Sequence, residues 1–102
     1  MNFTATLRQG VLVLSLEGEL DEHGANELRR HADRAIDEHA VAERAVFDLG
    51  QVSFMDSTGI GFLIGRYKKL KRYGISCFVS RVNAETDKIL SISGVYSLIP
   101  KI

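Results

Sequence analysis

The chain has 102 residues, 45% of them hydrophobic, and its 13 basic and 13 acidic residues give a formal net charge of +0. This length fits a single domain with a real core and leaves little room for a second one. The balanced charge argues against binding nucleic acid or an anionic membrane, because both need an excess of cations. No signal-like start and no bilayer-length apolar run occur, so we expect a soluble cytoplasmic protein.

The first part of the chain predicts a β-hairpin followed by a helix. Apolar residues alternate from Phe3 to Leu7, as in a half-buried strand, and Gln9-Gly10 is a turn signal. Val11 to Leu16 predicts the more buried hairpin partner. Asp21 is placed to cap a helix from His23 to His39, whose apolar residues recur at helical spacing.

The middle of the chain predicts a strand and a second helix. Arg44 to Leu49 is a short apolar strand, and Gly50-Gln51 is expected to turn the chain before it continues from Val52 to Asp56. An apolar stripe from Ile60 to Leu70 predicts a helix that ends at Gly74. Cations crowd the last turns of this helix, where they favour the negative end of its dipole.

The last part predicts a strand, a short helix and a final strand. Ile75 to Ser80 is an apolar strand that contains Cys77, a lone cysteine expected to be buried and inert. Asn83 is expected to cap a helix that ends at Gly94. Three of its residues are expected to face inward: Ile89, Leu90 and Ile92. Tyr96 to Ile99 is then expected to form the last strand, with Pro100 at its edge.

The predicted order is therefore β-β-α-β-α-β-α-β, in one α/β domain spanning residues 1–102. Strands that are joined by helices are expected to lie parallel, with right-handed crossovers. The first two strands form the antiparallel part, so the sheet is expected to be mixed, with helices packed against it.

The segment from Asp56 to Gly65 is unusual because it places three glycines in a predicted helix, at Gly59, Gly61 and Gly65. Each costs about 1 kcal/mol relative to alanine inside a helix. The glycines therefore indicate a close approach of backbones. One explanation is tight packing inside the domain. The other is an open helix start that a partner or a phosphate can reach, and the two explanations are compatible.

Ser57 and Thr58 fall where a parallel strand gives way to a helix, which is where ligands gather in open α/β sheets. Ser57 as a simple helix cap is the alternative. Phe54 and Met55, beside these hydroxyls, are either exposed or part of the core. Phosphorylation of Ser57 would add a charge of about −1.5 to −2 next to Asp56 and could switch binding without unfolding the domain.

Enzyme and metal templates fit poorly. The glycines lack the lysine of a phosphate-binding loop, and their spacing is one residue too long for a dinucleotide site. Ser57 is followed by Gly59, but Met55 stands where a nucleophile elbow needs its first glycine. His23, His31 and His39 are eight residues apart, which rotates each by about 80° from the last, so they share no metal-binding face. We expect no enzyme, no cofactor and no metal site.

Several segments resemble the motifs of bacterial anti-sigma factor antagonists, and the sporulation-type branch is the most similar. The central one runs from Val52 to Gly61, V-S-F-M-D-S-T-G-I-G, and continues with Gly65-Arg66-Tyr67-Lys68. Gly18-Glu19-Leu20-Asp21 resembles a second motif, and Ser91-Ile92-Ser93-Gly94-Val95 a third. Members commonly carry a further helix after the last strand, and this sequence ends at Ile102 before such a helix.

The resemblance implies the STAS fold and regulation by partner switching. The unmodified protein would bind an anti-sigma factor that is itself a serine kinase, and a sigma factor would thereby be released. The kinase would phosphorylate Ser57, with Thr58 as the second candidate acceptor, and the modified protein would dissociate until a serine phosphatase restores it. The partner-binding residues would be Asp21, Glu22, Phe54, Met55, Asp56, Thr58, Gly59 and Gly61, with Glu19 beside them.

The sequence leaves two other functions as alternatives. One is a STAS-type sensor of a nucleotide or an anion within a signalling complex, which needs an enclosed pocket behind the glycines. The other is a hydrolase that uses Ser57, for which no base is placed to activate the hydroxyl. The oligomeric state is expected to be a monomer or a weak dimer.

Overall fold

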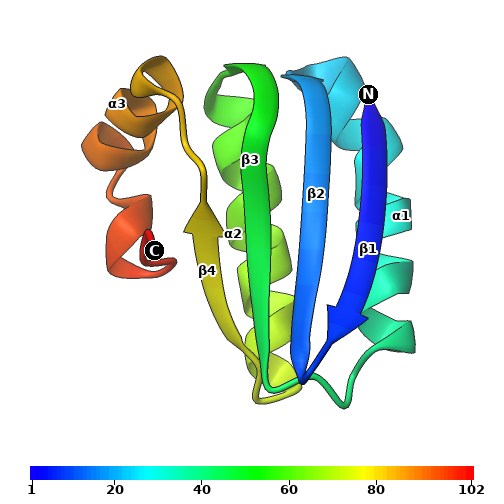
Figure 1. Cartoon of the computed structure of the whole chain (residues 1–102). Coiled ribbons are helices and arrows are strands. Elements are labelled where there is room, and N and C mark those ends of the chain that lie inside the picture. Colours follow the sequence, from blue (N-terminus) through cyan, green and yellow to red (C-terminus); the bar gives the residue numbers. More distant parts are fainter.

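The computed structural model describes residues 1–102 as one mixed sheet with helices, shown in Figure 1. The elements are β1 (Asn2–Arg8), β2 (Val11–Leu20), α1 (Glu22–Glu38), β3 (Arg44–Met55), α2 (Ser57–Arg72), β4 (Ser76–Ser80), α3 (Ala84–Ser93) and the 3-10 turn η1 (Val95–Ser97). The sheet order is β1-β2-β3-β4, with β1 antiparallel to β2 and the other pairs parallel. The expected α/β fold with a mixed sheet is confirmed.

The hairpin between β1 and β2 closes as the sequence predicts. Gln9 and Gly10 both have positive φ angles, 50° and 81°. Two positive φ angles in a two-residue loop are typical of the type I′ turn, whose twist matches that of the flanking strands. Arg8 and Val11 are therefore paired on either side of the turn.

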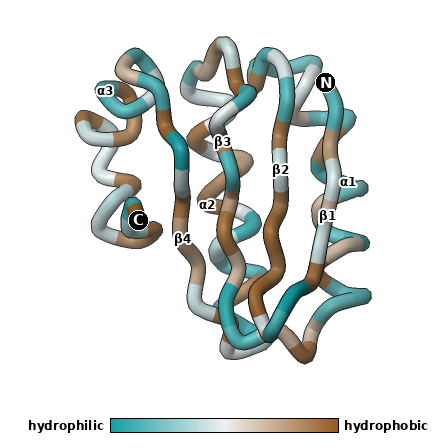
Figure 2. Tube along the Cα trace, in the orientation of Figure 1, coloured by the Kyte–Doolittle hydropathy of each residue, from teal (hydrophilic) through white to brown (hydrophobic).

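The core lies between the sheet and helices α1 and α2, which lie behind the strands in Figure 1. Alternate residues of β2 point toward the helices, and Leu12, Leu14 and Leu16 are at most 1% exposed. Burying a leucine side chain contributes about 1.5–3 kcal/mol. Figure 2 shows the resulting hydrophobic stretches along the central strands β2 and β3. These two long parallel strands provide the frame that carries the ends of the helices.

Helices α1 and α2 are also joined by a partly buried ion pair. Arg66 is one of the cations in the last turns of α2, yet it is only 9% exposed. Its Nε lies 2.8 Å from Asp33 Oδ1 on α1, and its guanidinium carbon lies 5.1 Å from the centre of the Phe62 ring. Burial lowers the pKa of Arg66, and the charge of Asp33 opposes that shift.

The expected turn at Gly50-Gln51 is wrong, because β3 runs through both residues without a break. The register between β2 and β3 shifts there instead, from Ser15 opposite Asp48 to Glu17 opposite Gln51. The Gly50 N–H donates to Asp48 Oδ1 at 3.0 Å, which supplies a partner for this irregular backbone. Glycine therefore marks a bulge, which bends a strand without ending it.

The expected last strand at Tyr96 to Ile99 is also wrong. Gly94 has a left-handed conformation, with φ of 82°, and the chain then coils into η1. The N–H of Ile99 donates to the carbonyl of Val95, four residues earlier, as in a helix. Both residues are buried in the core. The segment expected to be a strand therefore begins as a helical turn. The only β-pairing after it is a single bridge between Lys101 and Val79.

Helix α3 otherwise follows the prediction, with Asn83 as its N-cap and Gly94 at its end. Leu90 is fully buried and Ile89 partly buried, as expected. Ile92 is 78% exposed, so its predicted inward orientation is wrong. None of the three helices combines the length and the apolar character needed to cross a membrane.

Candidate functional site

Three helices begin at one edge of the sheet, where the parallel strands β2, β3 and β4 end. Each has a side-chain cap: Asp21 accepts from Gly24 N–H at 2.9 Å, Asp56 from Thr58 N–H at 2.9 Å, and Asn83 from Thr86 N–H at 2.8 Å. The sequence predicted the caps at Asp21 and Asn83 and placed Asp56 at the end of the preceding strand. Two helix-capping carboxylates, those of Asp21 and Asp56, therefore follow the carboxyl ends of the neighbouring strands β2 and β3.

Ser57 is the first residue of α2 and is exposed. It is therefore not the cap, because Asp56 occupies that position and accepts a second bond from Gly59 N–H at 3.4 Å. The Asp56 carboxylate already neutralises the positive end of the helix dipole. This leaves the Ser57 hydroxyl free, while the place that a bound anion would take is filled by the protein's own carboxylate.

Phe54 and Met55 point in opposite directions at the end of β3. Phe54 is 48% exposed, so its ring is available to a partner. Met55 is only 2% exposed and belongs to the core, which does not fit its expected contact with a partner. The physical reason is that consecutive residues of a strand face opposite sides of the sheet. Met55 therefore supports the site from inside.

The glycines of α2 divide between the two expected explanations. A Cβ on Gly59 would lie 2.6 Å from Met55 Cγ and 2.8 Å from the carbonyl oxygen of Leu20, so Gly59 is required by packing within the domain. A Cβ on Gly61 would meet nothing within 4 Å, and Gly61 is exposed. Close approach by a partner is therefore possible at Gly61 and not at the buried Gly59.

Asp21 and Glu22 lie at the start of α1, just after the strand end that neighbours the one before Ser57. Leu20 on β2 is paired with Met55 on β3, so the residues that follow them, Asp21 and Asp56, come at neighbouring strand ends. Asp21 is partly buried through its capping role, whereas Glu22 and Glu19 are exposed. The acidic segment and the Ser57 loop therefore begin at neighbouring strand ends. We call Glu19, Asp21, Glu22 and Asp56 the acidic rim.

One contribution to the site was not foreseen in the sequence. Asn83 Nδ2 donates to the carbonyl oxygen of Val52 at 2.9 Å, in addition to capping α3. This bond ties the start of α3 to the strand that carries the site. The sequence signalled the cap but contained no indication of the second bond, because that bond depends on the sheet order.

Comparison with known proteins identifies the family. The family model of the STAS domain matches residues 2–102. The chain belongs to the STAS domain family. This STAS domain is also 37% identical to an anti-sigma F factor antagonist of Paenibacillus polymyxa, over 90% of this chain and 78% of that protein. It is thus grouped with the anti-sigma factor antagonists, and the resemblance inferred from the motifs is confirmed.

Solved structures agree with this assignment. An anti-sigma factor antagonist from Mycobacterium paratuberculosis aligns with a TM-score of 0.84 at 26% identity, covering 98% of this STAS domain and 83% of that chain. The antagonist SpoIIAA aligns in its unphosphorylated form with a TM-score of 0.78, covering 99% of this domain and 88% of that chain. Its phosphorylated form from Bacillus aligns with a TM-score of 0.70, covering 99% and 91%. Both alignments are at 24% identity and show the shared fold.

Proposed function

We propose that this protein in its unmodified form binds an anti-sigma factor that is also a serine kinase, and that phosphorylation of Ser57 ends this binding. Release of a sigma factor, and so activation of its genes, would follow from the bound state. The proposal makes the protein a ligand and a substrate of the kinase, with no chemistry of its own. A serine phosphatase would restore the unmodified form, and all of these partners would meet in the cytoplasm.

The observation that carries the proposal is the exposure of Ser57 beside a helix start already capped by Asp56. The hydroxyl lies outside the cap, so a kinase reaches it without unwinding α2. The partner would contact the surface formed by Phe54, Gly61 and Thr58, with Asp21 and Glu22 on the neighbouring strand end.

The same geometry explains how a phosphate would weaken binding. A phosphoserine carries a charge of about −1.5 to −2 at pH 7. The helix N-terminus would normally stabilise this charge, but Asp56 Oδ1 already accepts from the N–H groups of Thr58 and Gly59. The phosphate would therefore stay beside Asp56, and it would disfavour binding to an acidic or apolar partner surface through repulsion and the cost of desolvation.

Similar proteins support the proposal. The relative from Paenibacillus polymyxa is named an anti-sigma F factor antagonist, and SpoIIAA has been solved both with and without its phosphate. A nucleotide or anion sensor is less well supported, because grooves of about 450 and 460 Å³ are lined by other residues than Ser57 and its neighbours.

Incubation with ATP and the anti-sigma factor kinase of the same organism tests the proposal. We expect one phosphate, located by mass spectrometry on the peptide that contains Ser57. The Ser57→Ala variant should remain unmodified, while Thr58→Val should be modified as the unaltered protein is. A phosphate on Thr58 or elsewhere, or none at all, would contradict the proposed switch.

A further inference from the structure

Strand β4 has a backbone donor and acceptor without a partner on its outer edge. The N–H of Val79 donates to the carbonyl of Pro100, and the carbonyl of Val79 accepts from Ile102 N–H, so both groups of Val79 point away from the sheet. Backbone direction alternates along a strand, so the N–H and carbonyl of Cys77 point outward as well. No bond of Cys77 to the C-terminal segment accompanies those of Val79.

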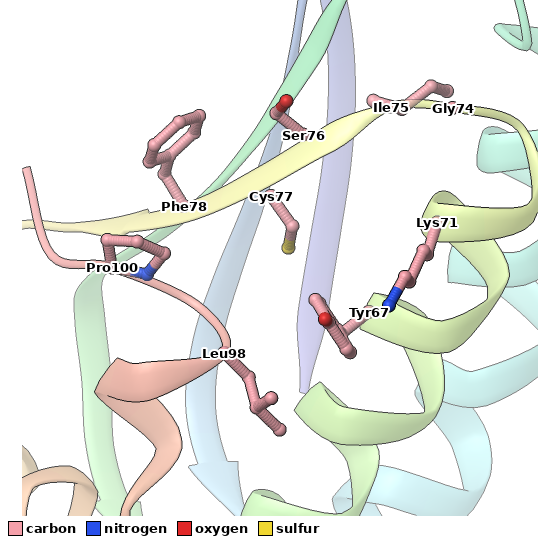
Figure 3. A pocket seen from close by; sticks show the side chains of 9 residues that line it. All are labelled: Tyr67, Lys71, Gly74, Ile75, Ser76, Cys77, Phe78, Leu98 and Pro100. Atoms are coloured by element: carbon pink, nitrogen blue, oxygen red, sulfur yellow. The ribbon is translucent and has the colours of Figure 1, made fainter.

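This unpaired position adjoins a groove of about 450 Å³ between β4, the end of α2 and the C-terminal segment. Figure 3 shows the Tyr67 ring of α2 in the space below Cys77, with the end of Lys71 beside this ring and Leu98 of the C-terminal segment farther below. Cys77 itself is only 5% exposed, and Leu98 is 41% exposed. Backbone N–H and carbonyl groups that lack hydrogen-bond partners cost free energy when they are shielded from water. An unpaired strand edge is also a template for another strand.

The charges of the groove restrict what can bind there. Lys71 is the one charged residue among the nine that line it, and its Nζ lies 5.9 Å from the centre of the Tyr67 ring. Arg72 and Lys68, on the same end of α2, are exposed as well. A bound segment therefore meets apolar walls and positive charge, with no carboxylate in the lining.

We propose that this groove binds an extended segment of a partner protein in which an apolar residue and an acidic residue stand two positions apart, because residues two apart on a strand face the same side. The segment would add to the sheet by pairing with the N–H and carbonyl of Cys77, in the manner of β-augmentation. An apolar side chain would enter the groove between Tyr67 and Leu98, and a carboxylate would lie near Lys71. The residues Pro100 to Ile102 already occupy the edge beside Val79, so the segment pairs only with the first part of β4.

This site is independent of the proposed kinase surface. The lining of the groove includes Gly74 to Phe78, at the beginning of β4. Ser57 begins α2 at the opposite end of the strands, after the carboxyl end of β3. A second protein could therefore bind while the Ser57 surface is occupied. The inference remains valid even where the proposed phosphorylation switch fails.

Nuclear magnetic resonance of the full ¹⁵N-labelled chain tests the inference with two synthetic peptides. The probe is acetyl-Asp-Thr-Val-Thr-Asp-amide, in which the valine and both aspartates face one side, and its control replaces each aspartate by lysine. We expect the probe to shift the amide signal of Cys77 and to slow its hydrogen exchange, while the control peptide does neither. Signals of Ser57 and Gly61 should be unchanged.

A matched pair of variants tests the role of charge. Lys71→Glu should weaken binding of the acidic probe about fivefold, as expected for loss of a rim charge worth about 1 kcal/mol. Lys68→Glu changes the same charge on the same helix outside the groove and should weaken binding much less. An unshifted Cys77 amide, an equal response to the lysine peptide, or equal effects of the two variants would overturn the inference. Protection of the Cys77 amide by self-association alone, seen as concentration-dependent dimers in sedimentation, would overturn it in favour of a second copy.

Discussion

Asp21 and Asp56 cap two neighbouring helices from adjacent parallel strands, directly after the paired residues Leu20 and Met55. Each carboxylate accepts from a backbone N–H at 2.9 Å. The two caps thereby fix where α1 and α2 begin, and they place two acidic groups at neighbouring strand ends beside Ser57. Several consequences of this arrangement can be measured.

The cap at Asp56 should stabilise the fold. Asp56→Ala is expected to lower the free energy of unfolding by about 1 kcal/mol, the usual cost of losing an N-cap. Asp56→Asn keeps an accepting oxygen and should lose less. Urea denaturation followed by circular dichroism measures both values. Equal losses for alanine and asparagine would show that the capping bonds are not the source of the stability.

The glycines of α2 should respond oppositely to the same substitution. Gly59→Ala should destabilise the domain by about 2 kcal/mol or more, because its Cβ would lie 2.8 Å from the Leu20 carbonyl oxygen, and overpacking costs typically 1–3 kcal/mol. Gly61→Ala meets no atom within 4 Å and should stabilise α2 by up to about 1 kcal/mol. Thermal unfolding distinguishes the two. Reduced kinase affinity of the stable Gly61→Ala protein would identify Gly61 as a partner contact.

The pair of Asp33 and Arg66 should show strong coupling. Asp33→Ala leaves the buried guanidinium without its counter-charge and should cost about 1–3 kcal/mol. Arg66→Met removes the charge and retains a long apolar side chain against Phe62. The double variant is therefore expected to be more stable than Asp33→Ala alone. A double-mutant cycle from urea denaturation would contradict this if the two losses simply add.

Cys77 should be chemically inert in the folded protein. Burial raises the pKa of its thiol to about 12, so hardly any thiolate is present at pH 8. We expect Ellman's reagent to react with Cys77 only at the rate at which the domain opens. The raised pKa also makes the free energy of unfolding depend on pH. The contribution is constant below the thiol's unfolded pKa of about 8.5 and decreases as the pH rises above it, because only the unfolded chain then loses the proton. Rapid labelling at pH 8 under native conditions would refute the burial.

Local patterns were enough to predict most of the fold, and the failures have physical causes. The caps at Asp21 and Asn83 and the hairpin turn at Gln9-Gly10 depend only on neighbouring residues, and they were predicted correctly. Gly50 was taken for a turn because glycine is common both in turns and in β-bulges. Only the pairing of β2 with β3 distinguishes the two cases. The last strand was mistaken for a different reason, because a short apolar run fits the period of a strand or of a helix.

The site was predicted in outline but not in its orientation. The sequence marked the segment from Phe54 to Gly61, yet it did not show that Met55 faces the core while Phe54 faces outward. It also did not separate Gly59, which packs on Leu20, from the open Gly61. The burial of Arg66 was missed because its partner Asp33 lies on another helix. Each of these features depends on contacts between distant parts of the chain.

The most direct test of the central claim is the affinity of the anti-sigma factor kinase for variants at Ser57, measured by isothermal titration calorimetry. Ser57→Ala should bind as the unmodified protein does, whereas Ser57→Asp should bind at least about tenfold more weakly, because it adds a negative charge beside Asp56. Ser91→Asp, with the same added charge on the exposed face of α3, serves as the control and should keep full affinity. Equal affinities of the Ser57→Ala and Ser57→Asp proteins would contradict the account.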